Sequence, residues 1–318
     1  MAQLHPVRFG IQTGQQNLGW QELRALWSSA DSWGYDSLWL YDHFYPIFTD
    51  PNGACHEGWT LLSALAQATR RARIGHLVTG NSYRNPCLLA KMAVTVDHVC
   101  DGRLNLGLGA GWFQLEHESF GIEFKPIGAR LGALEEACRI VKGMLRGERV
   151  SLDGRHYRVR DAHAVPGPVQ VGGPPLMIGG AGRKVLLRIV AEHADMWNYF
   201  GAPADMKELI DVIRSHGDRA GRDTDAIEKS VAMPLCYSLD EDRQLAACQM
   251  LAHAYGLTPE KARGRMMIGG RDECLDKVAA YRAIGITHFV FMCFAPVFSD
   301  ELQAFAEEVA PQARAMAG

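Results

Sequence analysis

An acid and a histidine stand together directly after an apolar run. In SLWLYDHF, residues 37–44, the apolar part is followed by Asp42 and His43. A histidine exchanges a proton near neutral pH, so His43 could serve as a general acid or base. Asp42 could orient this histidine or bind a substrate. The structural alternative is that the pair forms only a turn and a helix cap.

A second stretch has the composition of an anion-binding turn. In PLMIGGAGRK, residues 175–184, an apolar run is followed by Gly179, Gly180, Ala181, Gly182 and Arg183, and a helical pattern begins. Glycines let a ligand approach the backbone closely, and the free N–H groups of a helix start favour phosphate. The alternative is a tight turn that requires a positive φ. These five residues are therefore candidate phosphate ligands.

Eight apolar, strand-like runs alternate with helical segments and must position these residues. The expected strands are residues 7–13, 37–41, 72–80, 102–111, 175–180, 195–200, 229–238 and 287–294. This alternation predicts a (β/α)8 TIM barrel, as one domain over residues 1–318. A doubly wound dinucleotide-binding sheet would need Gly-x-Gly-x-x-Gly after the first strand, and QTGQQNLGW lacks it.

Two details of the expected fold concern its irregular parts. Residues 147–175 contain Asp-Gly and Pro-Gly-Pro turns, and we interpret them as an insertion before the fifth strand that could form a hairpin. Helical spacing predicts single helices over about 258–267 and about 299–315.

The carboxyl ends of barrel strands meet at one rim, where barrel enzymes have their active sites. The expected strand ends bring polar, small and aromatic groups to this rim. They are Gln12, Asp42, His43, Thr79, Ala110, Gly111, Trp112, residues 179–183 and Asn198. This combination suits a flat heteroaromatic ring that carries a polar tail, with a small molecule as the substrate.

The composition argues against several other classes of function. The net charge is −3 and no apolar run approaches the roughly 20 residues that span a bilayer, so we expect neither nucleic acid nor a membrane as partner. The eight cysteines have no Cys-x-x-Cys spacing, and Gly121 interrupts a His-Glu-x-x-His pattern that begins at His117, so no metal site is expected. Free thiols and the lack of a signal-peptide pattern in residues 1–10 predict a cytoplasmic protein.

Together these stretches resemble the luciferase-like monooxygenase superfamily, in its F420-dependent oxidoreductase branch. The resemblance rests on SLWLYDHF, TVDHVCDGRLNLGLGAGWFQLEHESFGIEF, LMIGGAGRKVLLRIVAEHADMWN and GITHFVF, which occur in family order over most of the chain. It implies a barrel with an insertion before the fifth strand, a deazaflavin or flavin ring in the barrel mouth, and a homodimer. It also implies a non-proline cis peptide at about His76–Leu77 beneath the ring, and ring or phosphate contacts that include Ile178.

The resemblance implies roles for individual residues as well. His43 matches the catalytic histidine of F420 sugar dehydrogenases, and Asp42 matches an acid that contacts substrate or ring in F420 alcohol dehydrogenases. Those sugar dehydrogenases have a glutamate where this chain has Trp112, and a tryptophan where it has Ile47. We therefore expect a flatter and less polar substrate than a sugar phosphate.

Three functional hypotheses follow. The first is an F420-dependent oxidoreductase in which His43 protonates or polarises an activated C=C, C=O or C=N bond. The second is an FMN-dependent monooxygenase that uses O2 and a flavin supplied by a partner reductase. The third is a barrel that binds a ligand without turnover. Binding of F420 compared with FMN separates the first two, and substitution of His43 tests the third.

Overall fold

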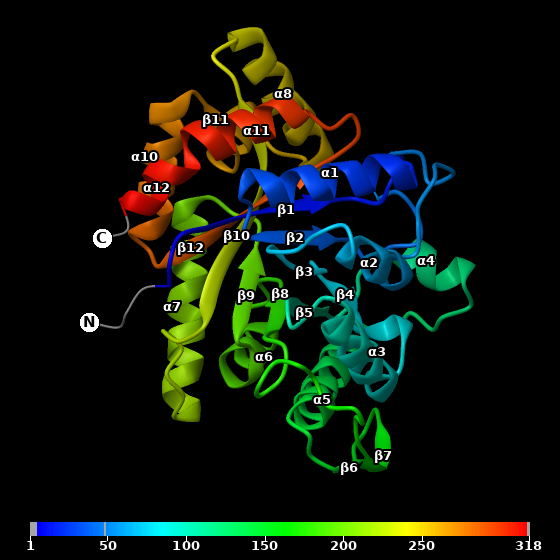
Figure 1. Cartoon of the computed structure of the whole chain (residues 1–318). Coiled ribbons are helices and arrows are strands. Elements are labelled where there is room, and N and C mark those ends of the chain that lie inside the picture. Colours follow the sequence, from blue (N-terminus) through cyan, green and yellow to red (C-terminus); the bar gives the residue numbers. More distant parts are fainter. Residues whose placement is uncertain (1–4, 48, 317–318) are drawn as a thin grey trace.

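The computed structural model describes residues 5–47 and 49–316, and in this part of the chain the expected barrel is present. Parallel strands pair in a ring, and β12 pairs with β1 to close it (Figure 1). The ring consists of β1 (Arg8–Thr13), β2 (Ser37–Leu40), β3 (Arg73–His76) with β4 (Thr79–Gly80), β5 (Leu104–Gly109), β8 (Leu176–Gly179), β9 (Met196–Tyr199), β10 (Glu228–Tyr237) and β12 (Ile286–Cys293). Residues 1–4, part of the segment examined for a signal peptide, lie outside the described residues.

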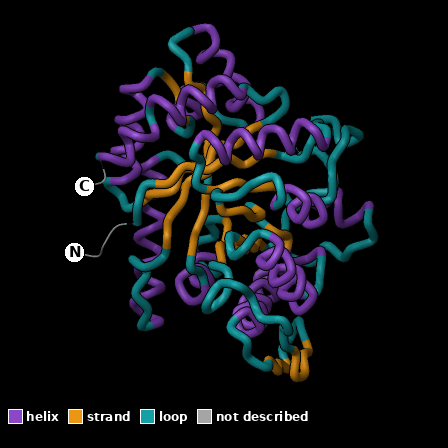
Figure 2. Tube along the Cα trace, in the orientation of Figure 1, coloured by secondary structure: helices purple, strands orange, loops and turns teal. Residues whose placement is uncertain are grey.

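Helices surround the strands on the outside of the barrel (Figure 2). They are α1 (Trp20–Trp33), α2 (Gly58–Ala66), α3 (Pro86–Val99), α5 (Ile127–Leu145), α6 (Leu186–His193), α7 (Pro203–Ala220), α10 (Arg271–Arg282), α11 (Ser299–Glu308) and α12 (Ala310–Ala315). Asn85 caps α3 and Pro86 occupies its first turn, where a missing N–H costs little. No helix in the described ranges has the length and apolar character needed to cross a membrane.

Shorter elements lie between the barrel units. The 3₁₀ helix η1 (Asn81–Tyr83) follows β4, and α4 (Gln114–Ser119) follows β5. Residues 147–175 contain the antiparallel pair β6 (Val150–Asp153) and β7 (Arg158–Ala162). After β10 come α8 (Glu241–Tyr255), α9 (Pro259–Gly264) and β11 (Met267–Gly269), which we call the cap. Figure 1 shows α8 and the β6–β7 hairpin at opposite sides of the molecule.

Two helix predictions were wrong in extent. The helix expected over 258–267 ends at Gly264, because β10 extends beyond the barrel and its free edge pairs with Met267 as a strand. The helix expected over 299–315 is divided at Val309 into α11 and α12. Pro311 has no N–H to continue the first helix, which explains the division.

The barrel interior holds an apolar layer above a polar base. The layer contains Trp39, Leu77, Met177, Met196, Ala232, Val290 and Met292. Below it, Arg8 and His288 lie 2.8 and 3.1 Å from the two oxygens of Glu228. Burial alone would raise the pKa of Glu228, but His288 and Arg8 hold it at about 2. The base of the barrel is therefore held together around the buried Glu228 carboxylate.

Candidate active site

The strand ends that carry the candidate residues are neighbours in the sheet. Leu40 pairs with His76, Thr79 with Leu108, and Gly179 with Asn198. The segments that follow these positions therefore meet at one rim, and the sequence candidates lie on or beside it.

His43 is held by a buried carboxylate. Its Nδ1 lies 2.9 Å from Oε2 of Glu116 in α4, and the Glu116 side chain is fully buried. The same carboxylate accepts the backbone N–H groups of Phe44 and Tyr45, at 2.5 and 3.1 Å, and the hydroxyl of Tyr83. Four donors therefore converge on one acid, and they fix the orientation of the imidazole.

Glu116 is ionised at neutral pH. Burial by itself would raise its pKa, but the hydrogen bonds from His43, Tyr83 and Tyr45 hold the pKa below the ordinary glutamate value. An ionised carboxylate only accepts hydrogen bonds, so Nδ1 of His43 carries the hydrogen. The other ring nitrogen, Nε2, is left to exchange a proton with a substrate.

Sequence reasoning missed Glu116 and considered Asp42 as the residue that orients His43 or binds a substrate. The signal was a carboxylate shortly after Trp112, next to the His-Glu pattern that was rejected as a metal motif. Asp42 instead accepts both guanidinium nitrogens of Arg84, at 2.6 and 3.0 Å, and the N–H of Gly80 at 2.8 Å. The buried Asp42 carboxylate thus ties β2 to the segment after β4.

Two aromatic rings lie beside His43. The rings of Trp112 and Phe113 meet the imidazole edge-on, with centroid separations of 5.6 and 5.8 Å. Trp112 is 57% exposed, so its indole has space to pack against a ligand. An imidazole beside exposed aromatic surface suits a flat organic molecule more than a strongly hydrated one.

The third barrel strand is interrupted by a bulge. The non-proline cis peptide is at Leu77–Val78, one residue beyond the expected His76–Leu77. Gln12 donates its amide hydrogen to the Leu77 carbonyl, at 2.6 Å, and thereby links the bulge to β1. A side chain at Gly109 would place its Cβ 2.7 Å from Val78 Cγ2, so this position on β5 has room for glycine only.

The side chain of His76 is placed away from the rim. Its ring packs against Trp59 of α2 with centroids 4.7 Å apart, and burial lowers its pKa to about 4. His76 is therefore neutral at physiological pH and belongs to the packing between barrel and α2. Only its backbone borders the bulge.

The glycine-rich turn after β8 is tightly held. Gly180 has a φ of +126°, its N–H donates to the Asn198 carbonyl at 3.1 Å, and its carbonyl accepts Trp197 Nε1–H at 2.8 Å. The Asn198 side chain donates to Ser230 at 2.9 Å. Arg183 is exposed and pairs with Glu208 at 2.5 Å. The sequence offered two interpretations of this turn, a phosphate-binding turn and a tight turn that requires a positive φ. The turn has the positive φ, and its small residues leave the backbone accessible, so both interpretations remain open.

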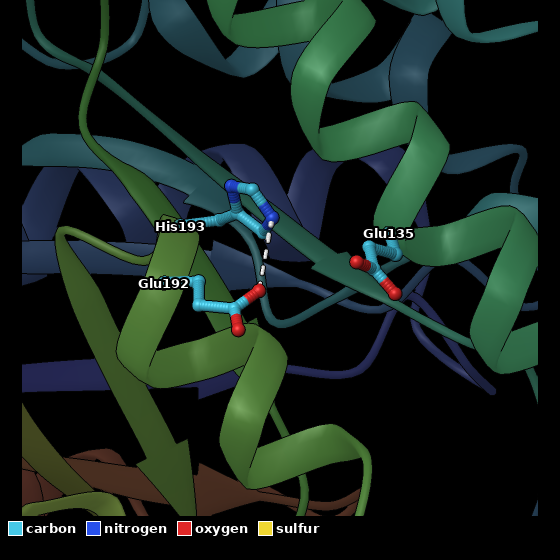
Figure 3. A group of neighbouring side chains, drawn as sticks. All are labelled: Glu135, Glu192 and His193. Atoms are coloured by element: carbon cyan, nitrogen blue, oxygen red, sulfur yellow. Dashed lines mark ion pairs between the residues drawn. The ribbon is translucent and has the colours of Figure 1, made fainter. Parts of the chain in front are cut away.

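A separate group of acids and a histidine lies between α5 and α6. Figure 3 shows Glu135, Glu192 and His193, the one set of three side chains in the described ranges with metal-ligating spacing. Arg188 donates to both carboxylates, at 2.7 and 2.8 Å, and its hydrogen bond lowers the pKa of Glu135. A bound cation would have to displace this guanidinium, so we interpret the group as an ion-pair network between two helices.

The luciferase-like monooxygenase family matches residues 1–265. This chain belongs to that family. The first eight curated relatives are F420-dependent glucose-6-phosphate dehydrogenases, and the one from Microbacterium testaceum is 27% identical over 97% of this chain and 98% of its own.

Solved structures show the same fold. An F420-dependent secondary alcohol dehydrogenase in complex with an F420–acetone adduct superposes with a TM-score of 0.86 at 20% identity, covering 96% of this chain and 98% of that one. The monooxygenase RslO1 from Streptomyces bottropensis has a TM-score of 0.78 at 20% identity, covering 96% and 99%. The fold alone therefore does not separate hydride transfer from oxygenation.

Proposed function

We propose that this family member is an F420-dependent oxidoreductase that transfers a hydride between the deazaflavin coenzyme and a small organic substrate. The observation that carries the proposal is the His43–Glu116 pair, a proton-exchanging group held at the rim beside Trp112. The names of the curated relatives support the coenzyme.

The described residues suit a flat ring above the bulge. Thr79 Oγ1 is buried and has no hydrogen-bond partner within the described part of the chain, which leaves it for a ligand. Small residues at Ala110 and Gly111 and the apolar Leu77 leave space for a planar group. We infer that these residues and Trp112 contact the ring. The turn of residues 178–183, with Asn198 beneath it, would hold the phosphate through its backbone.

The chain supplies the proton for the reaction. When bound, the deazaflavin gives or accepts a hydride at a ring carbon, so two electrons move in one step. Nε2 of His43 would take the hydroxyl proton of an alcohol during oxidation, or return it to a carbonyl oxygen during reduction. Glu116 would keep Nδ1–H in place and compensate the charge of the imidazolium. Asp42 would hold the segment after β4 through Arg84.

The substrate is proposed to be less polar than a sugar phosphate. Trp112 and Phe113 flank His43 with aromatic surface, and Phe200 and Phe294 pack against the apolar barrel layer. An enone, imine, ketone or secondary alcohol fits this lining. We also propose a cytoplasmic homodimer that receives reduced coenzyme from a separate reductase; the eight free cysteines are consistent with a reducing compartment.

A paired titration with oxidised F420 and FMN tests the proposal, with quenching of tryptophan fluorescence as the signal. We expect tight binding of F420, weak binding of FMN, and a smaller signal in Trp112→Phe. A preference for FMN would replace the proposal with the FMN-dependent monooxygenase. His43→Gln should bind F420 as the wild type does but lose turnover, and unchanged turnover would remove the role of His43.

A further inference from the structure

Tyr41 lies between the end of β2 and His43, and the proton transfer described above gives it no part. Successive side chains of an extended strand point to opposite faces. Trp39 belongs to the apolar layer inside the barrel, whereas Leu38 and Leu40 pack in the larger core that includes the surrounding helices. The alternation therefore turns Tyr41 toward the barrel interior, on the same face as Trp39.

Contacts with the neighbouring strand ends support this placement. Gln12 of β1 pairs with Trp39 of β2, and Gly14 follows two residues later. A Cβ at Gly14 would lie 2.9 Å from Cε2 of Tyr41, so the tyrosine ring packs directly on the backbone after β1. The Gly14 N–H donates to the carbonyl of Cys293, the last residue of β12, at 3.4 Å. The Tyr41 ring thus lies where the ends of β2 and β1 meet, next to the end of β12.

The backbone of Tyr41 is held on both sides by one side chain. The Gln15 amide accepts the N–H of Tyr41 at 3.1 Å and donates to its carbonyl at 2.7 Å. The imidazole of His43 lies beside the tyrosine, with ring centroids 6.2 Å apart. Tyr41 is therefore a firmly positioned third aromatic ring next to His43, in addition to Trp112 and Phe113.

The hydroxyl of Tyr41 is buried without a partner. Tyr41 is only 7% exposed, and its hydroxyl oxygen makes no hydrogen bond within the described residues. By contrast, the equally buried Tyr35 donates to the carbonyl of Leu302 at 2.8 Å. A buried polar group without a partner destabilises the folded protein, and native proteins contain few of them. We therefore expect a ligand to supply the partner of the Tyr41 hydroxyl.

This hydroxyl keeps its hydrogen at neutral pH. Burial holds the pKa of Tyr41 well above its ordinary value, and the nearby Tyr255 of the cap and Cys293 raise it further. A neutral phenol donates one hydrogen bond. Near His43, the chain therefore offers a fixed donor as well as the imidazole Nε2, which exchanges a proton.

We propose that the Tyr41 hydroxyl donates a hydrogen bond to the substrate oxygen on the carbon that exchanges the hydride. The inference rests on the proposed function. During oxidation the alcohol O–H bond breaks and its proton passes to Nε2 of His43, the C–H electron pair leaves as hydride to the coenzyme, and the C=O bond forms. Tyr41 stabilises the negative charge that develops on the oxygen. In reduction the carbonyl oxygen accepts hydrogen bonds from Tyr41 and from protonated His43.

Two donors at one position select the class of substrate. A carbonyl oxygen has two lone pairs and accepts from both donors, whereas an imine nitrogen has one lone pair and an iminium nitrogen has none. A site built to hydrogen-bond a substrate group rejects an analogue that leaves its buried donor unpaired. Tyr41 therefore narrows the proposed substrates to ketones and secondary alcohols, and it disfavours imines.

Tyr41→Phe tests the inference because it removes the hydroxyl and keeps the ring against Gly14. With F420 and cyclohexanol, kcat should fall by about 10²-fold, since one donor to a developing oxyanion is lost. F420 binding should be unchanged. The melting temperature should equal or exceed that of the wild type, because the folded protein loses no hydrogen bond. Tyr35→Phe is the matched control, in which the melting temperature should fall and kcat should stay the same.

A panel of secondary alcohols, ketones and cyclic imines, assayed with oxidised and reduced F420, tests the substrate class. We expect turnover of alcohols and ketones and none of imines. An unchanged kcat in Tyr41→Phe, or a melting temperature lowered as in Tyr35→Phe, would overturn the inference and leave the proposed function intact. Turnover of imines alone, or of no compound in the panel by protein that binds F420, would also overturn the inference. Failure of the wild type to bind F420 would overturn the proposed function and this inference with it.

Discussion

Replacement of Glu116 with glutamine should reverse the tautomer of His43 while the barrel stays folded. The amide oxygen can keep the two backbone N–H groups of Phe44 and Tyr45. The amide NH2 group would then face Nδ1 of His43, where two donors cannot coexist. Nδ1 would become an acceptor and the hydrogen would move to Nε2, so the neutral ring could no longer take a proton from an alcohol.

The expected losses of stability and rate follow from the hydrogen bonds of Glu116 that change. Glu116 loses two charge-assisted hydrogen bonds, to His43 and Tyr83, and both are partly replaced by weaker neutral ones. We expect a loss of about 1–3 kcal/mol in the free energy of unfolding at neutral pH. Proton transfer contributes roughly 10²- to 10⁴-fold to a rate, so alcohol oxidation should fall by about that factor.

The stability loss should depend on pH. The pKa of Glu116 in the folded protein is below the ordinary value of 4.5, so its contribution is fully present above that value. It is lost as the pH falls through the folded pKa. The difference in stability between wild type and Glu116→Gln should therefore be largest at neutral pH and should shrink below about pH 4.5.

Nitrogen NMR of the histidine side chains measures the tautomer directly, with the His43 signals assigned by their loss in His43→Gln. The wild type should show protonated Nδ1 and the variant protonated Nε2. Glu118→Gln, an exposed change on the same helix, should leave the tautomer and the rate unaltered. A protonated Nδ1 in Glu116→Gln, or full activity with a reversed tautomer, would refute the reasoning.

Three further substitutions test other parts of the structure. Gly109→Ala should destabilise the protein by about 1–3 kcal/mol in thermal unfolding and weaken F420 binding, because its Cβ would lie 2.7 Å from Val78 Cγ2; no loss would contradict the tight contact. Glu228 has a depressed pKa of about 2, so the wild type should lose stability as the pH falls from 4.5 toward 2, and Glu228→Gln should flatten this dependence in urea unfolding. Arg84→Leu leaves the buried Asp42 carboxylate without its guanidinium and should cost about 3–5 kcal/mol in urea unfolding, and a milder loss would show that the carboxylate finds another partner.

The barrel could be predicted because the signals for its strands are local in the sequence. Each strand is a short apolar run bounded by turns, and residue types reveal such runs without knowledge of the partner strands. The rim followed from the fold class, which explains why Thr79, Ala110 and Gly179 were correctly expected at or directly after strand ends. The missed β11 is a three-residue strand that exists only because β10 offers a free edge, and apolar Met267 fits a helix equally well.

Of the two residues in the His43–Glu116 contact, only His43 could be predicted from the sequence. His43 follows a strand and stands out, but Glu116 lies 73 residues away and reaches it only through the path of the loop after β5. Asp42 and Glu116 are both acids near His43, and nothing in their local sequence says which one contacts it. The structure shows that Asp42 is paired with Arg84, a residue 42 positions along the chain, and this leaves Glu116 as the partner of His43.

The separate apolar core of the cap has a consequence for how mutations in this protein combine. The cap helices pack on their own apolar cluster, which contains Cys248, Leu251 and Met266. The cap joins the barrel through β10 and β11, and through ion pairs of Arg243 with Glu301 in α11 and of Arg265 with Asp205 in α7. Phe200 contacts both this cluster and the barrel interior. The cap thus has an apolar core of its own, whereas His43 and Glu116 lie after β2 and in α4. Substitutions that repack this core should therefore have little epistatic effect on the contact between His43 and Glu116, which shares no residue with it.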